Sequence, residues 1–337
     1  MDIVLLAPAL LDAEGYFDAE GVKRFDALEM LLSRASKSIV TEESLSALLA
    51  NQFAYTQEPD RDIPIAAIGR LIDDEKRPEA YWIRADPVHL RADQKSLNLL
   101  DVSYLSLTQH DALAIAAVVQ PSFSELGWEL EVPVPSRWYL KLDKKPAIRT
   151  TELHSVLGKD IQSFMPFGED APTWHRLMNE IQMRLHNADI NTMRSERGEL
   201  AVNSLWPWGG GCLPDLLERK WSRVYSDENC TMGFSMLSNT PCLALPETAD
   251  TLLQEQSDAA SVLVVMSDFY TRILDGGQAG RLLEKFEKNW CRFLLQGLRD
   301  NSVHSLRIIT RKAEFNLNRR SLWKFWSKVN SLDQFTT

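Results

Sequence analysis

The chain has 337 residues, of which 45% are hydrophobic, so it contains enough apolar material to bury a sizeable core. That proportion excludes an intrinsically disordered protein and a small scaffold held together by disulfides. The 47 acidic residues outnumber the 37 basic ones, and the net charge of −10 argues against a general nucleic-acid-binding protein.

The sequence predicts a cytoplasmic protein that does not cross a membrane. The first apolar stretch, Ile3 to Leu11, is too short for a signal peptide and has no basic residue before it. No apolar run approaches the roughly 20 residues needed to span a bilayer. The four cysteines have no CxxC pairing and no regular spacing, which indicates reduced thiols and argues against a zinc site.

In the first part of the chain, short apolar strands alternate with amphipathic helices. The predicted elements, in chain order, are a strand over 3–6, helices over 24–37 and from 41 onward, a strand over 81–84, a helix over 108–119 and a hairpin or edge strand over 126–140. Thr108 is a predicted N-cap, and Asp111 completes its capping box. Pro133 and Pro135 favour an edge or a bulge for the last segment.

The second part of the chain continues this alternation. Its predicted elements are a helix over 173–185, strands over 202–208 and 261–266, a helix over 281–299, a hairpin over 306–317 and a short basic helix after it. The unbroken apolar run from Val262 to Val265 is typical of a parallel strand buried on both faces. We therefore expect an α/β protein with a mostly parallel sheet flanked by helices. Residues 1–103 and 186–337 are expected to form its core, with 104–185 as a smaller inserted α+β lobe.

Three consecutive glycines, Gly209 to Gly211, follow a predicted strand and precede a helix predicted over 215–221. Glycines at a strand-to-helix turn let backbone N–H groups approach an anion, and the helix dipole favours negative charge there. The segment is neither a P-loop nor a GxGxxG motif. A tight turn that requires positive φ is the simpler explanation of the glycines alone.

Arginines and one aspartate are further candidates for a binding site. Guanidinium groups recognise phosphate and carboxylate bidentately, and the candidates are Arg84, Arg137, Arg194 and Arg197. Surface salt bridges with the acidic residues are the simpler explanation of any one of them. Asp268 follows the 261–266 strand, where ligands bind in doubly wound sheets, although an aspartate there also serves as a helix cap.

Taken in order, several segments resemble the archaeal-type cofactor-independent phosphoglycerate mutases of the alkaline phosphatase superfamily. They are Ile83-Arg84-Ala85-Asp86, Arg137-Trp138-Tyr139-Leu140, Leu153-His154 with Gly158-Lys159, Asn191-x-x-Arg194, Val202 to Pro214 with its glycines, and the Val262 strand with Asp268. The chain resembles more closely a bacterial offshoot, the Rpf-type regulatory proteins, in which the Asp86 to Asp101 stretch and the terminal Leu-Trp-Lys-Phe-Trp are typical.

The resemblance implies an alkaline-phosphatase-like fold, two manganese or magnesium ions, and a serine that carries the phosphoryl group. This sequence departs from that pattern at the metal ligands. Ala7-Pro8 stands where the family has Asp-Gly, Arg272 where it has a histidine, and Thr310-Arg311 where it has Asp-His. His154 is followed by Ser155 instead of aspartate, and Trp208 replaces an arginine. Because two-metal phosphoryl transfer requires such ligands, the departures predict loss of the metal centre.

Three hypotheses follow. The leading one is a divergent mutase-like pseudoenzyme, without metal or other cofactor, that binds a phosphorylated or carboxylated small molecule and acts as a regulatory protein. The resemblance implies that its ligand site contains Arg84, Arg137, His154, Asn191, Arg194, Gly209, Gly211, Asp268 and Arg272. The alternative is an active mutase or phosphatase, with manganese or magnesium held by carboxylates drawn from Asp2, Asp12, Asp86, Asp268 and Asp275.

The third hypothesis is an interaction protein that uses its C-terminus. Residues 305–328 contain seven basic residues and one acidic residue, with Trp323 and Trp326 among them. Such a segment suits an acidic protein partner or nucleic acid. A solvated hairpin and a helix docked by its tryptophans is the simpler explanation in a chain this acidic, and the acidic charge argues against nucleic acid as a partner.

Overall fold

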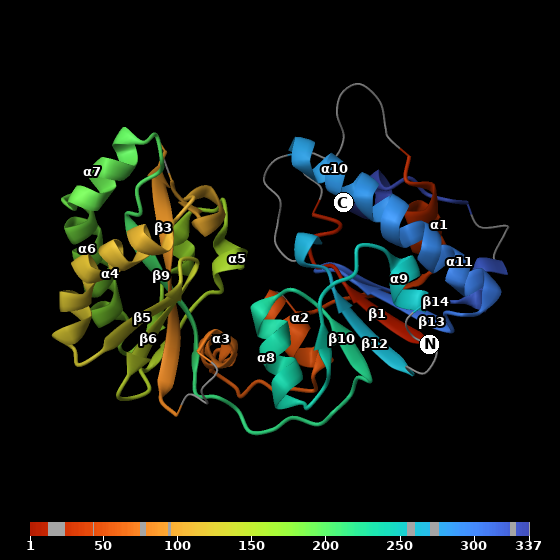
Figure 1. Cartoon of the computed structure of the whole chain (residues 1–337), viewed down its shortest axis with the longest axis horizontal. Helices are drawn as coiled ribbons and strands as arrows, with labels where there is room; N and C mark the ends of the chain where they lie inside the picture. The colour runs from red at the N-terminus through yellow and green to blue at the C-terminus, as the bar shows by residue number, and fades with distance from the viewer. Residues whose placement is uncertain are drawn as a thin grey trace. The chain divides into compact units, whose positions relative to one another are not determined.

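The computed structural model describes residues 1–12, 24–42, 44–74, 79–93, 96–254, 260–269, 276–323 and 328–336. The chain divides into two compact units (Figure 1). The core unit comprises Met1–Tyr55 and Leu216–Thr337, and the inserted unit comprises Thr56–Asp215. Within the described residues, no helix is long and apolar enough to cross a bilayer.

The core unit contains a seven-stranded mixed sheet of order β11-β10-β12-β1-β13-β14-β2. Five neighbouring strands are parallel, and β14 is antiparallel to both of its neighbours. The strands are β1 (Asp2–Leu6), β2 (Ser36–Ile39), β10 (Arg223–Tyr225), β11 (Cys242–Leu243), β12 (Ser261–Val265), β13 (Ser305–Ile309) and β14 (Ala313–Asn318). The predicted strands at 3–6 and 261–266 and the predicted hairpin at 306–317 are confirmed.

Helices cover both faces of this sheet. One face packs a large apolar cluster against α1 (Asp26–Arg34), α9 (Ala249–Gln254), α10 (Gly276–Phe286) and α11 (Arg292–Asp300), with a π-helical turn over Glu287–Cys291 between the last two. Figure 1 shows α2 (Leu45–Gln52) and α8 (Asn229–Leu237) on the opposite face. Strand β14 alternates between the faces, since Phe315 and Leu317 are buried in the cluster while Glu314 and Asn316 lie on the other side.

The inserted unit is built on a five-stranded antiparallel sheet. Strands β3 (Tyr81–Ala92), β4 (Leu97–Leu100), β5 (Glu129–Val134) and β6 (Arg137–Leu142) run in the order β4-β3-β6-β5, and β9 (Ser204–Gly211) also pairs with β3. Strands β7 (Ile148–Arg149) and β8 (Phe167–Gly168) form a separate pair. The β5–β6 hairpin has a bulge between Glu131 and Val134, as its prolines predicted.

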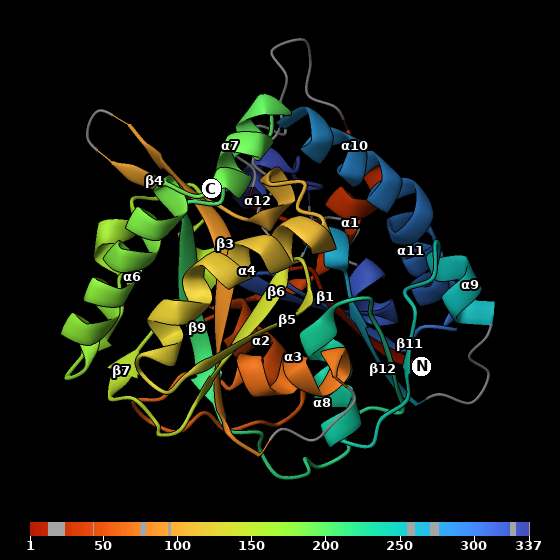
Figure 2. The ribbon, with the colours of Figure 1, turned by 60° about the vertical axis from the view of Figure 1, so that its left-hand side comes forward.

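Helices pack on both faces of the inserted sheet as well. An apolar cluster joins one face to α4 (Gln109–Ser124), α6 (Ala171–His186) and α7 (Asp189–Glu196), which lie together in Figure 2. Helix α3 (Ile65–Asp73) packs on the other face through Ala66 and Ala67 against Trp82 and Tyr139. A short α5 (Leu153–Val156) precedes one 3-10 segment over Ile161–Phe164. The apolar periodicity of 173–185 correctly predicted α6.

The structure corrects three predictions. The insertion spans 56–215 rather than 104–185, because β3 pairs with β9 and with β6 instead of joining the core sheet. The helix predicted over 215–221 is absent, and the Leu217 N–H instead donates to the carbonyl of Leu237. The three glycines belong to β9 itself and not to a turn.

Candidate functional site

Arg84 of β3 and Trp208 of β9 are cross-strand partners at the centre of the inserted sheet. The guanidinium carbon of Arg84 lies 5.2 Å from the centre of the Trp208 ring and 5.1 Å from that of Tyr139. Its Nε and Nη2 donate to Asp86 Oδ1 over 3.0 and 2.7 Å. Only 5% of Arg84 is exposed, so this is a buried ion pair between two aromatic rings.

Asp86 is fully engaged by the protein. Residues 84 and 86 lie on the same face of β3 because side chains alternate along a strand. Asp86 Oδ1 also accepts from the Trp138 backbone N–H over 3.2 Å, and Oδ2 accepts from Trp208 Nε1 over 2.7 Å. Asp86 is a candidate metal ligand by its sequence position, but its 1% exposure and these donors make it the counter-ion of Arg84.

Arg137 and Asp73 form a second ion pair next to the first. Arg137 Nε and Nη2 donate to the two Asp73 oxygens over 2.8 and 2.7 Å, and the Tyr139 hydroxyl donates to Oδ2 over 2.5 Å. Burial raises the pKa of Asp73, but the hydrogen bonds from Arg137 and Tyr139 outweigh burial and hold that pKa below its ordinary value. The Arg137 side chain is 31% exposed, so a solute can reach it.

His154 and Gly209 complete this group, which we call the Trp208 cluster: Asp73, Arg84, Asp86, Arg137, Tyr139, His154, Trp208 and Gly209. The His154 ring lies edge-on to Trp208 at 5.7 Å, and its Nδ1 is 3.5 Å from Glu152. The Gly209 N–H donates to the Thr150 hydroxyl over 3.2 Å. Four of the residues implied by the resemblance are thus brought together, namely Arg84, Arg137, His154 and Gly209.

The glycines serve close packing instead of holding an anion. Gly209 has φ of +64°, and a Cβ there would lie 3.0 Å from the Cβ of Ile65 at the start of α3. A Cβ on Gly211 would lie 2.5 Å from Pro64 Cβ. The Gly210 backbone hydrogen-bonds to Asp62, whose pKa is raised by burial in spite of hydrogen bonds from Thr150. The N–H groups of Gly209 and Gly210 are therefore bonded within the protein, contrary to the predicted anion-binding turn.

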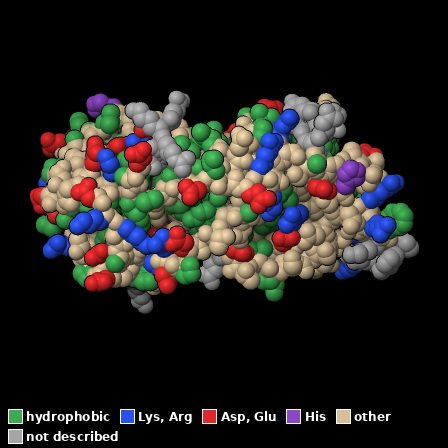
Figure 3. All heavy atoms as spheres, turned by 90° about the horizontal axis from the view of Figure 1, so that it is seen from below, with side chains coloured by type: hydrophobic (Ala, Val, Ile, Leu, Met, Phe, Trp, Pro, Cys, Tyr) green, Lys and Arg blue, Asp and Glu red, His purple; other side chains and the backbone are tan. Residues whose placement is uncertain are grey.

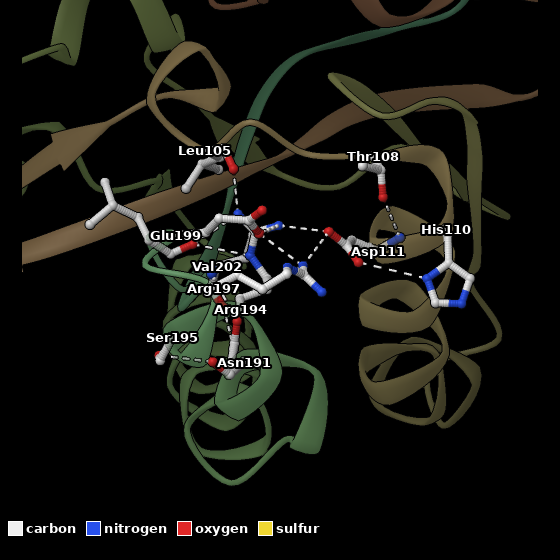
Figure 4. A network of polar contacts seen from close by, with 11 residues as sticks. Leu105, Thr108, His110, Asp111, Asn191, Arg194, Ser195, Arg197, Glu199 and Val202 are labelled. Carbon is white, nitrogen blue, oxygen red and sulfur yellow. Dashed lines mark hydrogen bonds and ion pairs between the residues drawn. The ribbon is translucent and has the colours of Figure 1, made fainter.

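Arg194 and Asn191 belong to a separate network, shown in Figure 4. Arg194 has no exposed surface; Nη1 is 2.9 Å from Asp111 Oδ2, Nε donates to the Leu200 carbonyl over 3.1 Å, and Nη2 donates to the Leu105 carbonyl. Asn191 donates to the carbonyls of Leu185 and Val202 and accepts from the Val202 N–H. These contacts fix α7 to α4 and to the chain entering β9. Both residues stabilise the fold, so the ligand role expected for them is not supported by this geometry.

The remaining expected residues lie elsewhere. Asp268, in the core unit just after β12, is exposed, and its carboxylate is 3.7 Å from Lys285 Nζ. It borders a pocket of about 160 Å³ that also contains Phe269 and Trp290. Arg272 and Asp275 lie outside the described residues.

The carboxyl ends of β1 and β13 show whether the core unit fits a divalent metal pair. Ala7 and Pro8 follow β1 and supply no side-chain ligand. After β13, the Thr310 hydroxyl donates to the Ala313 carbonyl, and Arg311 forms an ion pair with Asp12 over 3.1 Å. The Asp12 carboxylate is already paired with a guanidinium, and the Thr310 hydroxyl is already hydrogen-bonded within the protein. Such groups do not fit a two-metal site. Among the described residues, no three His, Cys, Asp or Glu side chains are grouped closely enough to hold a metal.

In the C-terminal segment, Trp323 is not docked on the protein as the simpler explanation above expected. Arg307 lies 3.8 Å from Glu314 within the β13–β14 hairpin, and the Trp323 side chain is 68% exposed, so Trp323 does not dock the segment. Trp326 lies outside the described residues. On the face shown in Figure 3, basic and acidic side chains of the described residues are interspersed. All four cysteines are free thiols, as predicted.

Comparison with known proteins gives a partial match. No family model matches the chain. A stretch of 61 residues, 18% of this chain, is 38% identical to the probable 2,3-bisphosphoglycerate-independent phosphoglycerate mutase of Geobacter sulfurreducens. A stretch of 64 residues, 19% of this chain, is 31% identical to the 2,3-bisphosphoglycerate-independent phosphoglycerate mutase of Methanosarcina barkeri. The similarity is to phosphoglycerate mutases. These matches span 15% and 16% of the two relatives.

Two solved structures resemble the chain over most of its length. The cofactor-independent phosphoglycerate mutase of Thermoplasma acidophilum aligns with 99% of this chain and 94% of its own, with 14% identity and a TM-score of 0.48. A protein of Pyrococcus horikoshii aligns with 94% of this chain and 86% of its own, with 9% identity and a TM-score of 0.48.

Proposed function

We propose that this chain is a divergent, phosphoglycerate-mutase-like protein of alkaline-phosphatase-like fold that binds a phosphorylated or carboxylated small molecule without a two-metal centre. The observation that carries the proposal is the donor set at the carboxyl ends of β1 and β13. There, Ala7-Pro8 and Thr310-Arg311 stand where the resemblance implies metal ligands, and Arg311 pairs with Asp12. Without such ligands, no cations neutralise the oxygens of a phosphoryl group in transfer. The local similarity to phosphoglycerate mutases supports the phosphorylated ligand.

The Trp208 cluster is the proposed ligand site in the inserted unit. Arg137 and His154 are its two basic side chains with appreciable exposure, at 31% and 21%. Asp73 orients the Arg137 guanidinium through two hydrogen bonds, so this cation is preorganised for an anion that approaches its exposed side. The buried Arg84–Asp86 pair holds Trp208 in place against His154 and acts as a positioning element.

We further propose that the protein has a regulatory role in the cytoplasm. It is supported by the resemblance of the 86–101 segment to bacterial Rpf-type regulatory proteins and by the four free thiols. Such a protein transmits ligand occupancy to a partner instead of turning over a substrate. The exposed Trp323 offers one side chain for contact with a protein partner.

A thermal-shift and activity experiment tests the proposal. Wild-type protein is heated with 3-phosphoglycerate, 2-phosphoglycerate or glycerate, and the same samples are assayed for mutase activity with added manganese. We expect a ligand-dependent rise in Tm, because binding to the native state stabilises it, and no interconversion of the phosphoglycerates. The Arg137→Gln variant is expected to lose the rise, while Arg149→Gln, a change of the same charge at a 38% exposed site, retains it. Manganese-dependent interconversion would establish the active-mutase alternative, and absence of any shift would contradict ligand binding.

A further inference from the structure

A polar groove of about 480 Å³ lies on the core sheet, on the face opposite the large apolar cluster. One row of side chains across four strands forms its floor: Val4 of β1, Arg307 of β13, Asn316 of β14 and Ser36 of β2 are successive register partners. The first residues of β1, β12 and β13 border the groove, so it lies toward the amino ends of the parallel strands. Its volume is within the range of about 300–1,000 Å³ typical of small-molecule sites.

Two cations from distant parts of the chain meet at this groove. Arg307 is 38% exposed, and its nearest carboxylate, Glu314, is 3.8 Å away, which is beyond hydrogen-bonding distance. Lys220, in the segment before β10, has its Nζ 5.3 Å from the ring of Trp221. Among the described residues, no carboxylate lies within ion-pair distance of Lys220. Burial, followed by the nearby charge of Arg307, lowers the pKa of Lys220, and the charge of Glu314 opposes this shift without cancelling it.

Asp2, which lines the groove, and Glu314, which lies beside it, are each hydrogen-bonded to a neighbouring side chain. Asp2 accepts a 2.6 Å hydrogen bond from the Ser305 hydroxyl, and Glu314 accepts one of 2.9 Å from the Asn316 amide. Lys220 and Arg307 carry like charges and repel each other, and the single nearby carboxylate of Glu314, 3.8 Å from Arg307, offsets only part of that repulsion. An anion bound between the two cations relieves the rest. A merely solvated face of the β13–β14 hairpin does not explain why Lys220 is brought beside Arg307, since Lys220 lies outside the hairpin.

We infer that this groove binds a small oxyanion, a phosphate or carboxylate group, between the Arg307 guanidinium and the Lys220 ammonium, with Trp221 as a wall. The guanidinium supplies a planar fork of donors and the ammonium a compact charge. The inference does not rest on the proposed function, whose ligand site is in the inserted unit. It also places the anion at the amino ends of the strands, whereas ligands of doubly wound sheets bind at the carboxyl ends.

Amide and indole NMR of the full chain tests the inference, with inorganic phosphate and acetate as separate probes. Sodium chloride at matched ionic strength is the reference. We expect saturable shifts for Lys220, Arg307 and the Trp221 indole with at least one probe. Arg307→Gln and Lys220→Gln should each weaken that binding about tenfold, since each removes a charge-assisted contact. The control is Arg281→Gln, an exposed residue of α10 on the sheet face that carries the large apolar cluster, which should bind as the wild type does.

The outcomes separate this site from the proposed function. Saturation with phosphate alone identifies a phosphate ligand, and saturation with acetate alone identifies a carboxylate ligand; both support the groove. Shifts that never saturate with either probe, or saturable shifts that both substitutions leave unchanged, overturn it. Arg137→Gln should leave the groove shifts intact, so failure of the Trp208 cluster to bind 3-phosphoglycerate has no bearing on this result. Circular dichroism of each variant confirms that lost binding is not lost folding.

Discussion

The Trp208 indole donates a 2.7 Å hydrogen bond to Asp86, and the same carboxylate accepts both donors of Arg84. This hydrogen bond joins β3 to β9, which are neighbours in the inserted sheet although positions 86 and 208 are 122 residues apart in the sequence. It also explains why an arginine, a tryptophan and an aspartate are all needed at this point. The charge of Arg84 is neutralised in the interior, whereas Arg137, although paired with Asp73, keeps 31% of its side chain exposed.

The buried pair predicts a large effect of Asp86→Asn. The amide keeps the shape but leaves Arg84 buried without a counter-ion, so we expect a loss of about 3 kcal/mol in the free energy of unfolding. Urea denaturation measures this loss. The matched control is Asp60→Asn, whose side chain is 94% exposed and whose nearest cation, Arg149, is 3.5 Å away; it should change stability by less than about 0.5 kcal/mol. Equal effects of the two substitutions would contradict the role assigned to Asp86.

Arg194 should matter for stability and not for ligand binding. Arg194→Lys cannot reproduce the hydrogen bonds to both Leu105 and Leu200 carbonyls, and we expect a loss of about 2 kcal/mol in stability. Arg197→Lys, at a 44% exposed position on the same carboxylate, should cost much less. The affinity for 3-phosphoglycerate, measured by calorimetry on folded Arg194→Lys protein, is expected to equal that of the wild type. A selective loss of affinity would return Arg194 to the ligand site.

The tight approach of α3 to β9 predicts the cost of a methyl group at Gly209. Gly198 offers a control, because its φ of +74° is similar and an added Cβ would meet nothing within 4 Å. Gly198→Ala should therefore lower the free energy of unfolding by only about 1 kcal/mol, the cost of holding alanine in the left-handed backbone conformation. Gly209→Ala should cost about 1 kcal/mol more, because Ile65 must move. Equal losses for the two variants in thermal unfolding would show that Ile65 does not resist the added methyl group.

Two buried carboxyls should titrate on opposite sides of the ordinary aspartate pKa of 3.8. Burial raises the pKa of Asp62 above this value, whereas the hydrogen bonds from Arg137 and Tyr139 overcome burial and place the pKa of Asp73 below it. The stabilisation from Asp73 is therefore complete above 3.8 and is lost as the pH falls through its folded-state pKa. Carboxyl-carbon NMR measures the pKa values of Asp62 and Asp73. The Arg137→Gln substitution should raise the pKa of Asp73, because it removes the guanidinium that holds that pKa down. An Asp73 that titrates above 3.8 in the wild type would contradict the pairing.

Local pattern predicted the elements of the core well and the division into units poorly. The unbroken apolar run at Val262 to Val265 correctly predicted a buried parallel strand, because that signal depends only on neighbouring residues. The boundaries of the inserted unit depend instead on the pairing of β3 with β9, segments more than 100 residues apart. The segment 215–221 fails as a helix because its backbone bonds to a distant carbonyl.

In the candidate site, too, local features were predicted from the sequence and long-range partners were not. Sequence located Arg84, Arg137 and Arg194 as the arginines of interest but gave no sign of the partners of the last two. Asp73 and Asp111 are 64 and 83 residues from their arginines, a separation that only the folded chain shows. The spacing of Arg84 and Asp86, two residues apart on one strand, was the one signal in the sequence that marked a counter-ion.

Metal stoichiometry tests the central claim most directly. The purified full chain is incubated with excess manganese, desalted and measured by elemental analysis, with the same protein treated with a chelator as the reference. We predict that manganese remains far below one ion per chain, because Ala7-Pro8 and Thr310-Arg311 do not supply a ligand set. Retention of one or two manganese ions per chain would contradict this prediction, and phosphoglycerate mutase activity would then become the leading explanation.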